Sequence, residues 1–259
     1  MRTKPTQDGG PGHRYLLPLI LPVKKEDAHL ISIFAFEATA SSPLQSYFYP
    51  SPSDRASAIK SLENMLVATL SNPAFTLMKA VDPETGEVAA YAVWERVIRS
   101  GSSQGREEQG LQERKWGGGM KLHLMSLTSG NELGEKKSIG AFVGAETAKF
   151  MDSWAKDMNY IELQGLATSP RFQRRGYATA LLKWGHERAD AEGQVSFLLG
   201  SPVGRYLYAS LGWKEVGQVV VDMMEWMEGA ERGDLGWGVW KLYHMIRLPR
   251  AAARVGLLD

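Results

Sequence analysis

TSPRFQRRGYATALLKWGHERADAEG, residues Thr168–Gly193, places two arginines and a glycine immediately before an amphipathic, alanine-rich segment. That segment predicts a helix from about Gly176 to Glu192, because its small and apolar residues recur at helical spacing. The expected buried stripe consists of Ala178, Leu181, Leu182, Gly185 and Ala189. Gly193 suits the C-terminal cap, and the apolar run Tyr160–Thr168 predicts a strand ahead of the turn. We therefore expect a strand–turn–helix unit.

The turn of this unit has the features of an anion site. The first turn of a helix leaves backbone N–H groups unpaired at the positive end of the helix dipole. Gly176 has no Cβ, so a ligand can approach the backbone closely, and Thr179 adds a hydroxyl. The cations Arg174 and Arg175 are unfavourable at this end of a helix unless an anion joins them. The pattern favours a phosphorylated ligand, such as a pyrophosphate, over a solvated arginine pair or a nucleic-acid patch.

Composition and spacing exclude several other classes of site. The chain has 259 residues, a formal net charge of +1 and no cysteine. It therefore has no disulfide framework, no thiolate metal site and no cysteine nucleophile, and no bulk charge to attract nucleic acid or an anionic membrane. It lacks a P-loop motif, a dinucleotide-binding glycine motif and a zinc-protease motif, and its five histidines are scattered, so we expect no metal.

Two motifs carry a specific resemblance. Residues Gln173–Ala178 match the pattern Gln/Arg-x-x-Gly-x-Gly/Ala, and Tyr208, Gly212 and Trp213 match a Tyr-x-x-x-Gly-Phe/Trp element farther along the chain. With the order of predicted elements from about Tyr15 to Leu248, the sequence resembles the GNAT superfamily of acetyl-CoA-dependent N-acetyltransferases. The segment PLQSYFYP is similar to fungal members.

The resemblance implies where acetyl-CoA would bind. It would lie in a splayed opening between the predicted strands Tyr160–Thr168 and Val195–Gly200. The signature, beginning at Gln173, would hold the pyrophosphate through the backbone N–H groups of Arg174, Arg175, Gly176, Tyr177, Ala178 and Thr179. The backbone of Leu166, Ala167 and Thr168 would hydrogen-bond the pantetheine arm. An amine acceptor would then attack the thioester directly in a ternary complex.

The same resemblance suggests catalytic groups. Tyr208 matches the position of the family's usual general acid, whereas Tyr206 would point elsewhere from a short helix. Glu162 is a candidate general base, because histone-acetylating relatives carry a glutamate at that offset; Asp222, Glu225 and Glu95 are the alternatives. Taken alone, Tyr208 could be a core aromatic residue and Glu162 could face solvent.

The order of predicted strands and helices indicates a mixed α/β fold with one sheet. The resemblance implies that this sheet is mostly antiparallel, with six to seven strands, helices on both faces and a splay between the two central strands. The clearest hairpin joins strands Phe75–Val81 and Val88–Val97. A helix over residues 140–159 would place Phe142, Ala145, Phe150 and Trp154 on or near one stripe, and Asp54 could cap an earlier helix. Residues 1–13 are expected to be a disordered tail, 14–249 a single domain with a mobile insertion at 99–119, and 250–259 a C-terminal tail.

These features predict an acetyltransferase that acts on an amine; a non-catalytic acyl-CoA-binding or protein-interaction module is the alternative. The apolar run Tyr15–Val23 is too short to span a bilayer, which takes about 20 residues, so no membrane partner is expected. No nucleic-acid partner is expected, since one arginine pair is not a basic stripe. The protein is expected in the cytoplasm or the nucleus, as a monomer or a homodimer. The sequence does not identify the amine.

Overall fold

A single seven-stranded sheet organises the part of the chain that the structure, a computed structural model, describes: residues 17–40, 42, 45, 48–98, 139–156, 158–226 and 238–253. The strand order is β1-β2-β3-β4-β5-β7-β6, and the one parallel pair is β4 and β5. The strands are β1 (Leu19–Pro22), β2 (Phe75–Val81), β3 (Val88–Val97), β4 (Tyr160–Thr168), β5 (Val195–Gly200), β6 (Lys214–Asp222) and β7 (Val239–Arg247). The predicted mixed α/β class and mostly antiparallel sheet are confirmed.

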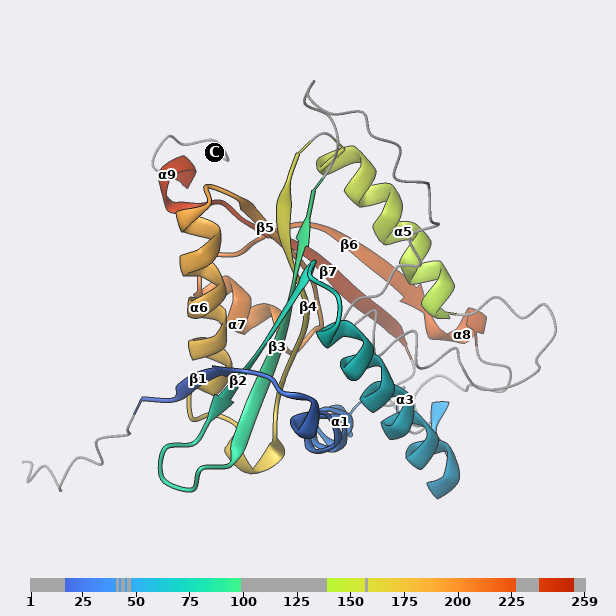
Figure 1. Cartoon of the computed structure of the whole chain (residues 1–259). Coiled ribbons are helices and arrows are strands. Elements are labelled where there is room, and N and C mark those ends of the chain that lie inside the picture. Colours follow the sequence, from blue (N-terminus) through green and yellow to red (C-terminus); the bar gives the residue numbers. More distant parts are fainter. Residues whose placement is uncertain are drawn as a thin grey trace, which may run out of the picture.

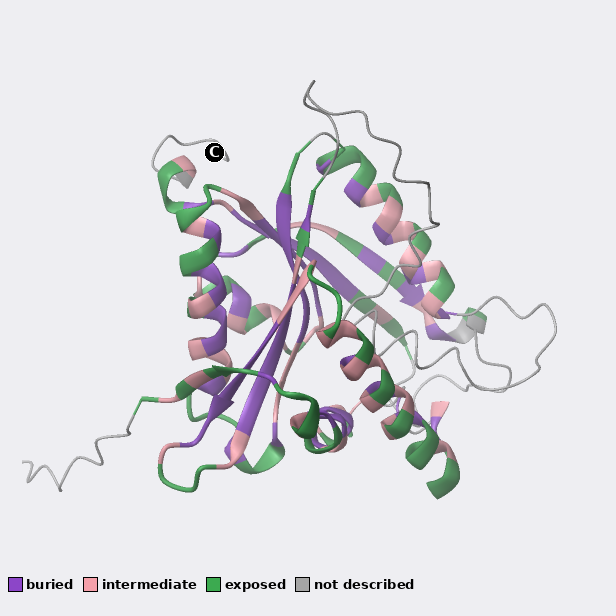
Figure 2. Cartoon of the chain, viewed as in Figure 1, coloured by how far each residue is buried: buried purple, intermediate pink, exposed green. Residues whose placement is uncertain are grey.

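Helices cover both faces of the sheet (Figure 1). On one face lie α6 (Tyr177–Ala191) and α7 (Arg205–Ser210); on the other lie α1 (Ala28–Glu37), α3 (Pro52–Leu70) and α5 (Ile139–Trp154). The shorter elements are η1 (Lys25–Asp27), η2 (Pro170–Phe172), α8 (Met223–Trp226) and α9 (Arg250–Ala253). Figure 2 shows the central strands β3 and β4 buried along most of their length, as expected for a sheet between two helical layers.

The helix predicted from the opening motif packs as expected. Leu181, Leu182 and Ala189 of α6 are fully buried against Trp94 and its neighbours on β3. Gly185 allows the closest approach, because a Cβ added there would lie 2.1 Å from Cζ2 of Trp94. Ala178 differs from the prediction, since it is only half-buried and faces a cleft.

Gly185→Ala should therefore destabilise the fold strongly. A methyl group at this position collides with the buried Trp94 indole, which must shift for the fold to form, and overpacking of this kind costs about 2–3 kcal/mol, or roughly 5–10 °C in Tm for a chain of this length. Thermal unfolding measures the effect. Gly144→Ala in α5 is the matched control, because nothing lies within 4 Å of its added Cβ; it should raise stability by about 0.5–1 kcal/mol. Equal Tm changes in the two variants would contradict this packing.

Two local expectations were wrong. Helix α3 begins at Pro52, and its N-cap is Ser51; Asp54 instead forms the other half of a capping box, in which the Ser51 hydroxyl accepts from the Asp54 N–H at 3.1 Å. Helix α5 buries Ile139, Val143, Thr147 and Met151, and leaves Trp154 41% exposed. Thr147 is compatible with this buried face because its hydroxyl donates to the Val143 carbonyl at 2.8 Å.

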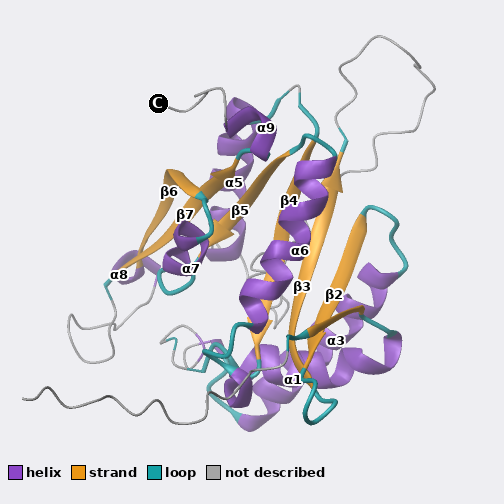
Figure 3. Cartoon of the chain, turned by 90° about the vertical axis from the view of Figure 1, so that its left-hand side faces the viewer, coloured by secondary structure: helices purple, strands orange, loops and turns teal. Residues whose placement is uncertain are grey.

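The two central strands separate partway along their length. Strands β4 and β5 pair from Tyr160↔Val195 to Leu163↔Leu198, and no farther, although β4 continues to Thr168. Figure 3 shows them diverging toward the end of β4 that leads into α6. The predicted splay is confirmed, and it leaves the later β4 backbone without a strand partner on that side.

Domain boundaries remain largely predictions. The predicted tail 1–13 and insertion 99–119 lie outside the described residues. The segment predicted as a C-terminal tail begins with α9, where the Arg250 N–H donates to Asp190 at 2.9 Å.

Candidate active site

The turn before α6 has an unusual backbone. Arg174 adopts a positive φ of 64°, and Gly176, the N-cap residue, follows with a φ of 89°. A left-handed conformation at a residue with a Cβ costs roughly 1–2 kcal/mol, so such residues gather at functional loops. No side chain of a described residue caps the helix, and its first intrahelical bond runs from the Ala180 N–H to the Gly176 carbonyl. The N–H groups of residues 177–179 thus point out of the helix end and can bind an anion.

Tyr177 fixes this helix end to the β2–β3 hairpin. Its buried hydroxyl donates to the Asp82 carboxylate at 2.5 Å, and Asp82 also accepts from the backbone N–H groups of Glu84 and Thr85. The bond to Tyr177, followed by these backbone bonds, lowers the pKa of Asp82. Burial and the bond to Asp82 raise the pKa of Tyr177 to about 12. Tyr177 was expected to bind the ligand through its backbone N–H. Its side chain also anchors the turn to the hairpin.

The two arginines of the motif differ. The Arg175 guanidinium lies 4.0 Å from the Asp82 carboxylate and 5.5 Å from the centre of the Phe172 ring. Arg174 lies at the cleft described next and forms no ion pair with any described residue. Asp82 thus supplies a negative charge for Arg175, one of the two arginines that the sequence places at the positive end of the helix. Arg174 remains available to bind an anionic ligand.

A cleft of about 1480 Å³ runs through the splay. Nine of the ten predicted cofactor-binding residues line it, Arg175 being the exception. These nine are Leu166, Ala167, Thr168, Gln173, Arg174, Gly176, Tyr177, Ala178 and Thr179. The cleft exceeds the roughly 300–1,000 Å³ typical of a site for one drug-sized ligand, so it has room for a donor and an acceptor together.

Tyr208 lines the same cleft from α7. It is 8% exposed, and its ring meets Trp213 edge-on, with the ring centres 6.2 Å apart. Its hydroxyl forms no hydrogen bond to a described residue, and burial alone raises the pKa of Tyr208 to about 12. It therefore stays protonated at neutral pH and can donate to a ligand. Tyr206, by contrast, is 68% exposed, and Arg205 donates to its hydroxyl at 3.4 Å.

Glu162 is buried but does not line the cleft. It lies directly opposite Glu95 on β3, and its neighbour Gln164 both lines the cleft and donates to the Glu95 carboxylate. The predicted solvent-facing alternative for Glu162 is wrong, because its side chain is 5% exposed. Asp222 and Glu225 lie away from the cleft wall. As a base, Glu162 would act through an intervening group.

Sequence reasoning missed the far wall of the cleft. It is formed by the end of α1 and the residues after it, by Leu62 of α3 and by Tyr91 of β3. These elements precede the signature by 75 residues or more in the chain, and no motif marks them. The alternation of β3 could have shown that Tyr91 and Glu95 share a face, but not that this face meets the splay.

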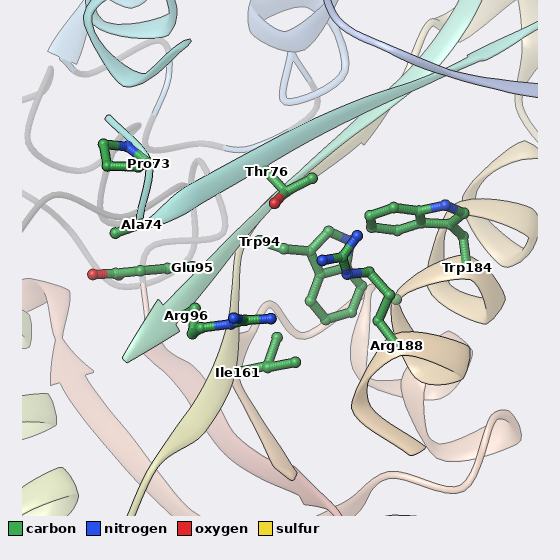
Figure 4. A pocket seen from close by; sticks show the side chains of 10 residues that line it. Pro73, Ala74, Thr76, Trp94, Glu95, Arg96, Ile161, Trp184 and Arg188 are labelled. Carbon is green, nitrogen blue, oxygen red and sulfur yellow. The ribbon is translucent and has the colours of Figure 1, made fainter. Parts of the chain in front are cut away.

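A second cavity, of about 150 Å³, lies between β3 and α6 (Figure 4). Its wall includes Trp94, Trp184 and Arg188, and the Arg188 guanidinium lies 5.4 Å from the centre of the Trp184 ring. The Trp94 indole N–H is buried and unpartnered among the described residues. The cavity holds only a few waters, each taking about 30 Å³, and cannot accept a nucleotide-sized ligand.

A buried histidine supports the Tyr208 region. The Trp213 indole N–H donates to His186 Nε2 at 2.9 Å, so His186 is neutral and carries its proton on Nδ1. Burial, followed by the charge of Arg247, lowers the pKa of His186 to about 4. Protonation would remove the acceptor that holds Trp213.

Stability should consequently fall between pH 7 and pH 4. The unfolded histidine binds a proton near pH 6.5, well above the folded value of about 4, so the unfolded state gains protons first as the pH drops. The expected loss is about 3 kcal/mol, since one pKa unit corresponds to about 1.4 kcal/mol. Urea unfolding at pH 7.5, 6 and 4.5 measures it, and His186→Gln should flatten the profile in that window. An equally steep profile in His186→Gln would refute this assignment.

Two further searches cover only the described residues. None of their helices is both long and apolar enough to cross a membrane. No group of three or more histidine, aspartate or glutamate side chains among them could hold a metal ion.

Comparisons with known proteins agree with this geometry. Residues 120–213 match the acetyltransferase (GNAT) family, a range that includes β4, the turn, α6, β5 and Tyr208. A search of curated proteins found no match.

Solved structures share the fold at low identity. One is histone acetyltransferase HPA2 and related acetyltransferase from Corynebacterium glutamicum: TM-score 0.52, 18% identity, covering 90% of this chain and 97% of that one. Another is the putative arylalkylamine N-acetyltransferase 7 of Aedes aegypti, with TM-score 0.54, 14% identity and coverage of 88% and 86%. Arylalkylamine N-acetyltransferase 2 of the same mosquito gives TM-score 0.51, 15% identity and coverage of 89% and 98%. Residues 120–213 thus match the acetyltransferase (GNAT) family, and the chain shares the fold of these solved acetyltransferases.

Proposed function

We propose that this protein transfers an acetyl group from acetyl-CoA to an amine, with both substrates bound at once. The observation that carries the proposal is the continuity of the cleft, which joins the anion-binding turn of α6, the unpaired edge of β4 and Tyr208. This continuity would place a site for a pyrophosphate, a site for an extended arm and a proton donor in one cavity.

The donor would be held by three features of the chain. The N–H groups of residues 177–179 and the Arg174 guanidinium would bind the pyrophosphate, as charge-assisted hydrogen bonds. The β4 backbone from Leu166 to Thr168, which has no strand partner on the splayed side, would pair with the amides of the pantetheine arm. The thioester would then lie deep in the splay, beside Tyr208.

The chemistry requires two proton movements. The neutral amine nitrogen attacks the thioester carbonyl carbon, a C–N bond forms, and the C–S bond breaks. Tyr208 would donate its proton to the leaving sulfur. The proton lost by the amine would pass through water to Glu162, which lies on the sheet face toward α1 and α5 and two residues from the cleft residue Gln164. The role of Glu162 remains a prediction from the sequence.

Release of free CoA thiol from acetyl-CoA in the presence of a panel of amines tests the proposal. The panel should include arylalkylamines, polyamines, amino sugars, lysine peptides and protein N-termini. Release that depends on one class of amine, with the acetylated amine identified by mass spectrometry, supports acetyl transfer. Acetyl-CoA binding without release with any amine would favour a non-catalytic acyl-CoA-binding module, and absence of CoA binding would contradict both functions.

A further inference from the structure

A second buried tyrosine lines the cleft, on the side opposite Tyr208. Tyr91 lies on β3, is 5% exposed, and packs edge-on against Phe34 of α1 with ring centres 5.9 Å apart. Its partner across the strands is Ala167, one of the residues expected to hold the pantetheine arm. The small Ala167 side chain shares the α1 face of the sheet with Tyr91, so little bulk separates the tyrosine from the splay.

The Tyr91 hydroxyl has no hydrogen-bond partner among the described residues. Burial raises the pKa of Tyr91 to about 12, so its hydroxyl is neutral at pH 7 and can donate a hydrogen bond. The Tyr91 hydroxyl oxygen is not among the fully buried unpartnered atoms of the described residues, so it reaches the cleft surface although the residue as a whole is buried. A ligand in the cleft can therefore form the hydrogen bond that the described residues do not supply, and a phenylalanine at this position could not.

The surroundings of Tyr91 indicate what such a ligand looks like. The nearby wall contains the apolar residues Ala35 and Ala38 at the end of α1 and Leu62 of α3, and the uncharged polar residues Thr39, Ser42 and Gln45. The described part of this wall has one charged side chain, the exposed Glu37, and no cation. The amide nitrogens of the other buried polar residues there, Gln45 and Gln164, already donate to protein groups. This half of the cleft therefore suits an uncharged body that is apolar where it meets Ala35, Ala38 and Leu62, with the Tyr91 hydroxyl as a polar contact that is still available.

We propose that Tyr91 is a specificity determinant for the acceptor: its hydroxyl hydrogen-bonds a polar group on the apolar body of the amine. This inference rests on the proposed acetyl transfer. The acceptor class that it names is a primary amine on a compact apolar or aromatic body that bears a hydroxyl or a similar hydrogen-bonding group. Tyr91 is a positioning residue, because it would touch the acceptor away from the reacting nitrogen.

A pair of amines that differ in one hydroxyl tests the inference. Tyramine and phenethylamine are compared as acceptors with the wild type and with Tyr91→Phe, using thiol release at saturating acetyl-CoA. The wild type should favour tyramine by about 10-fold in kcat/KM, the worth of one hydrogen bond in a buried site. Tyr91→Phe should bring this ratio close to one through KM for tyramine, with KM for acetyl-CoA unchanged.

Tyr160→Phe is the matched control, since Tyr160 is a buried tyrosine on the same sheet that does not line the cleft. It should keep the preference for tyramine. The inference is overturned if Tyr91→Phe retains the preference for tyramine, or if the wild type shows no preference. The same conclusion follows if the enzyme acetylates other amines but neither tyramine nor phenethylamine. It is also overturned if Tyr91→Phe lowers Tm by several degrees, since the hydroxyl would then hold the fold. Absence of thiol release with every amine would instead count against the proposed function.

Discussion

Ala178→Asp should abolish acetyl-CoA binding and leave the fold intact. Ala178 lies in the first turn of α6 and lines the cleft beside the left-handed turn. A carboxylate in this turn interacts favourably with the helix dipole, so Tm should stay the same or rise slightly. The same carboxylate would occupy the position proposed for the pyrophosphate. Stability and ligand binding should therefore change independently in one variant.

The expected loss of affinity follows from the charges. Two like charges 4 Å apart repel by about 4 kcal/mol at the effective dielectric constant typical of a protein surface. Solvent screening reduces this value, and the lost N–H contacts add to it, so the Kd for acetyl-CoA should rise at least about 100-fold. Isothermal titration calorimetry measures the Kd, and thermal unfolding measures the fold.

Ala180→Asp is the control for this experiment. Ala180 lies two residues farther along α6, is half-buried like Ala178, and does not line the cleft. It adds the same charge to the same helix turn, so it should leave the Kd within about threefold. Equal losses of affinity in the two variants would mean that a general charge effect, rather than occupation of the site, is responsible.

Tyr208→Phe should lower kcat by about 100-fold, the usual lower limit for loss of a general acid, with the Kd for acetyl-CoA nearly unchanged. The phenylalanine ring keeps the edge-on contact with Trp213, and the lost hydroxyl has no hydrogen bond to a described residue. The change should therefore affect the chemical step and not the fold. Steady-state thiol release and calorimetry separate the two quantities.

Tyr206→Phe serves as the comparison. Tyr206 also borders the cleft, but it is largely exposed and bonded to Arg205. Its kcat should stay within about twofold of the wild type. If Tyr206→Phe is the slower variant, or if Tyr208→Phe is as fast as the wild type, the assignment of the acid to Tyr208 is wrong.

The strands of the sheet could be predicted from local signals, whereas the splay was expected from the family resemblance. Strands Phe75–Val81, Val88–Val97 and Tyr160–Thr168 have the predicted bounds, because turn residues and apolar runs mark their ends. The Gln173–Ala178 signature predicted the turn and the start of α6, because its glycine stands directly before an amphipathic segment. In the structure, Gly176 has the positive φ that glycine adopts readily. Local pattern was also enough to place Tyr208 on a short helix after β5.

Long-range contacts could not be predicted in this way. The interaction of Arg175 with Asp82 joins residues 93 positions apart, and no spacing rule connects them. The buried face of α5 contains Thr147, whose satisfied hydroxyl makes a polar residue compatible with the core. Tyr91 lies on a strand whose two faces are both covered, so its position at the cleft depends on where β4 and β5 separate.

A crystal structure with bound CoA tests the central claim most directly. We expect the pyrophosphate within hydrogen-bond distance of the N–H groups of residues 177–179, the pantetheine arm along Leu166–Thr168, and the thiol sulfur within reach of the Tyr208 hydroxyl. CoA bound outside the splay, or with its thiol directed away from Tyr208, would contradict the account.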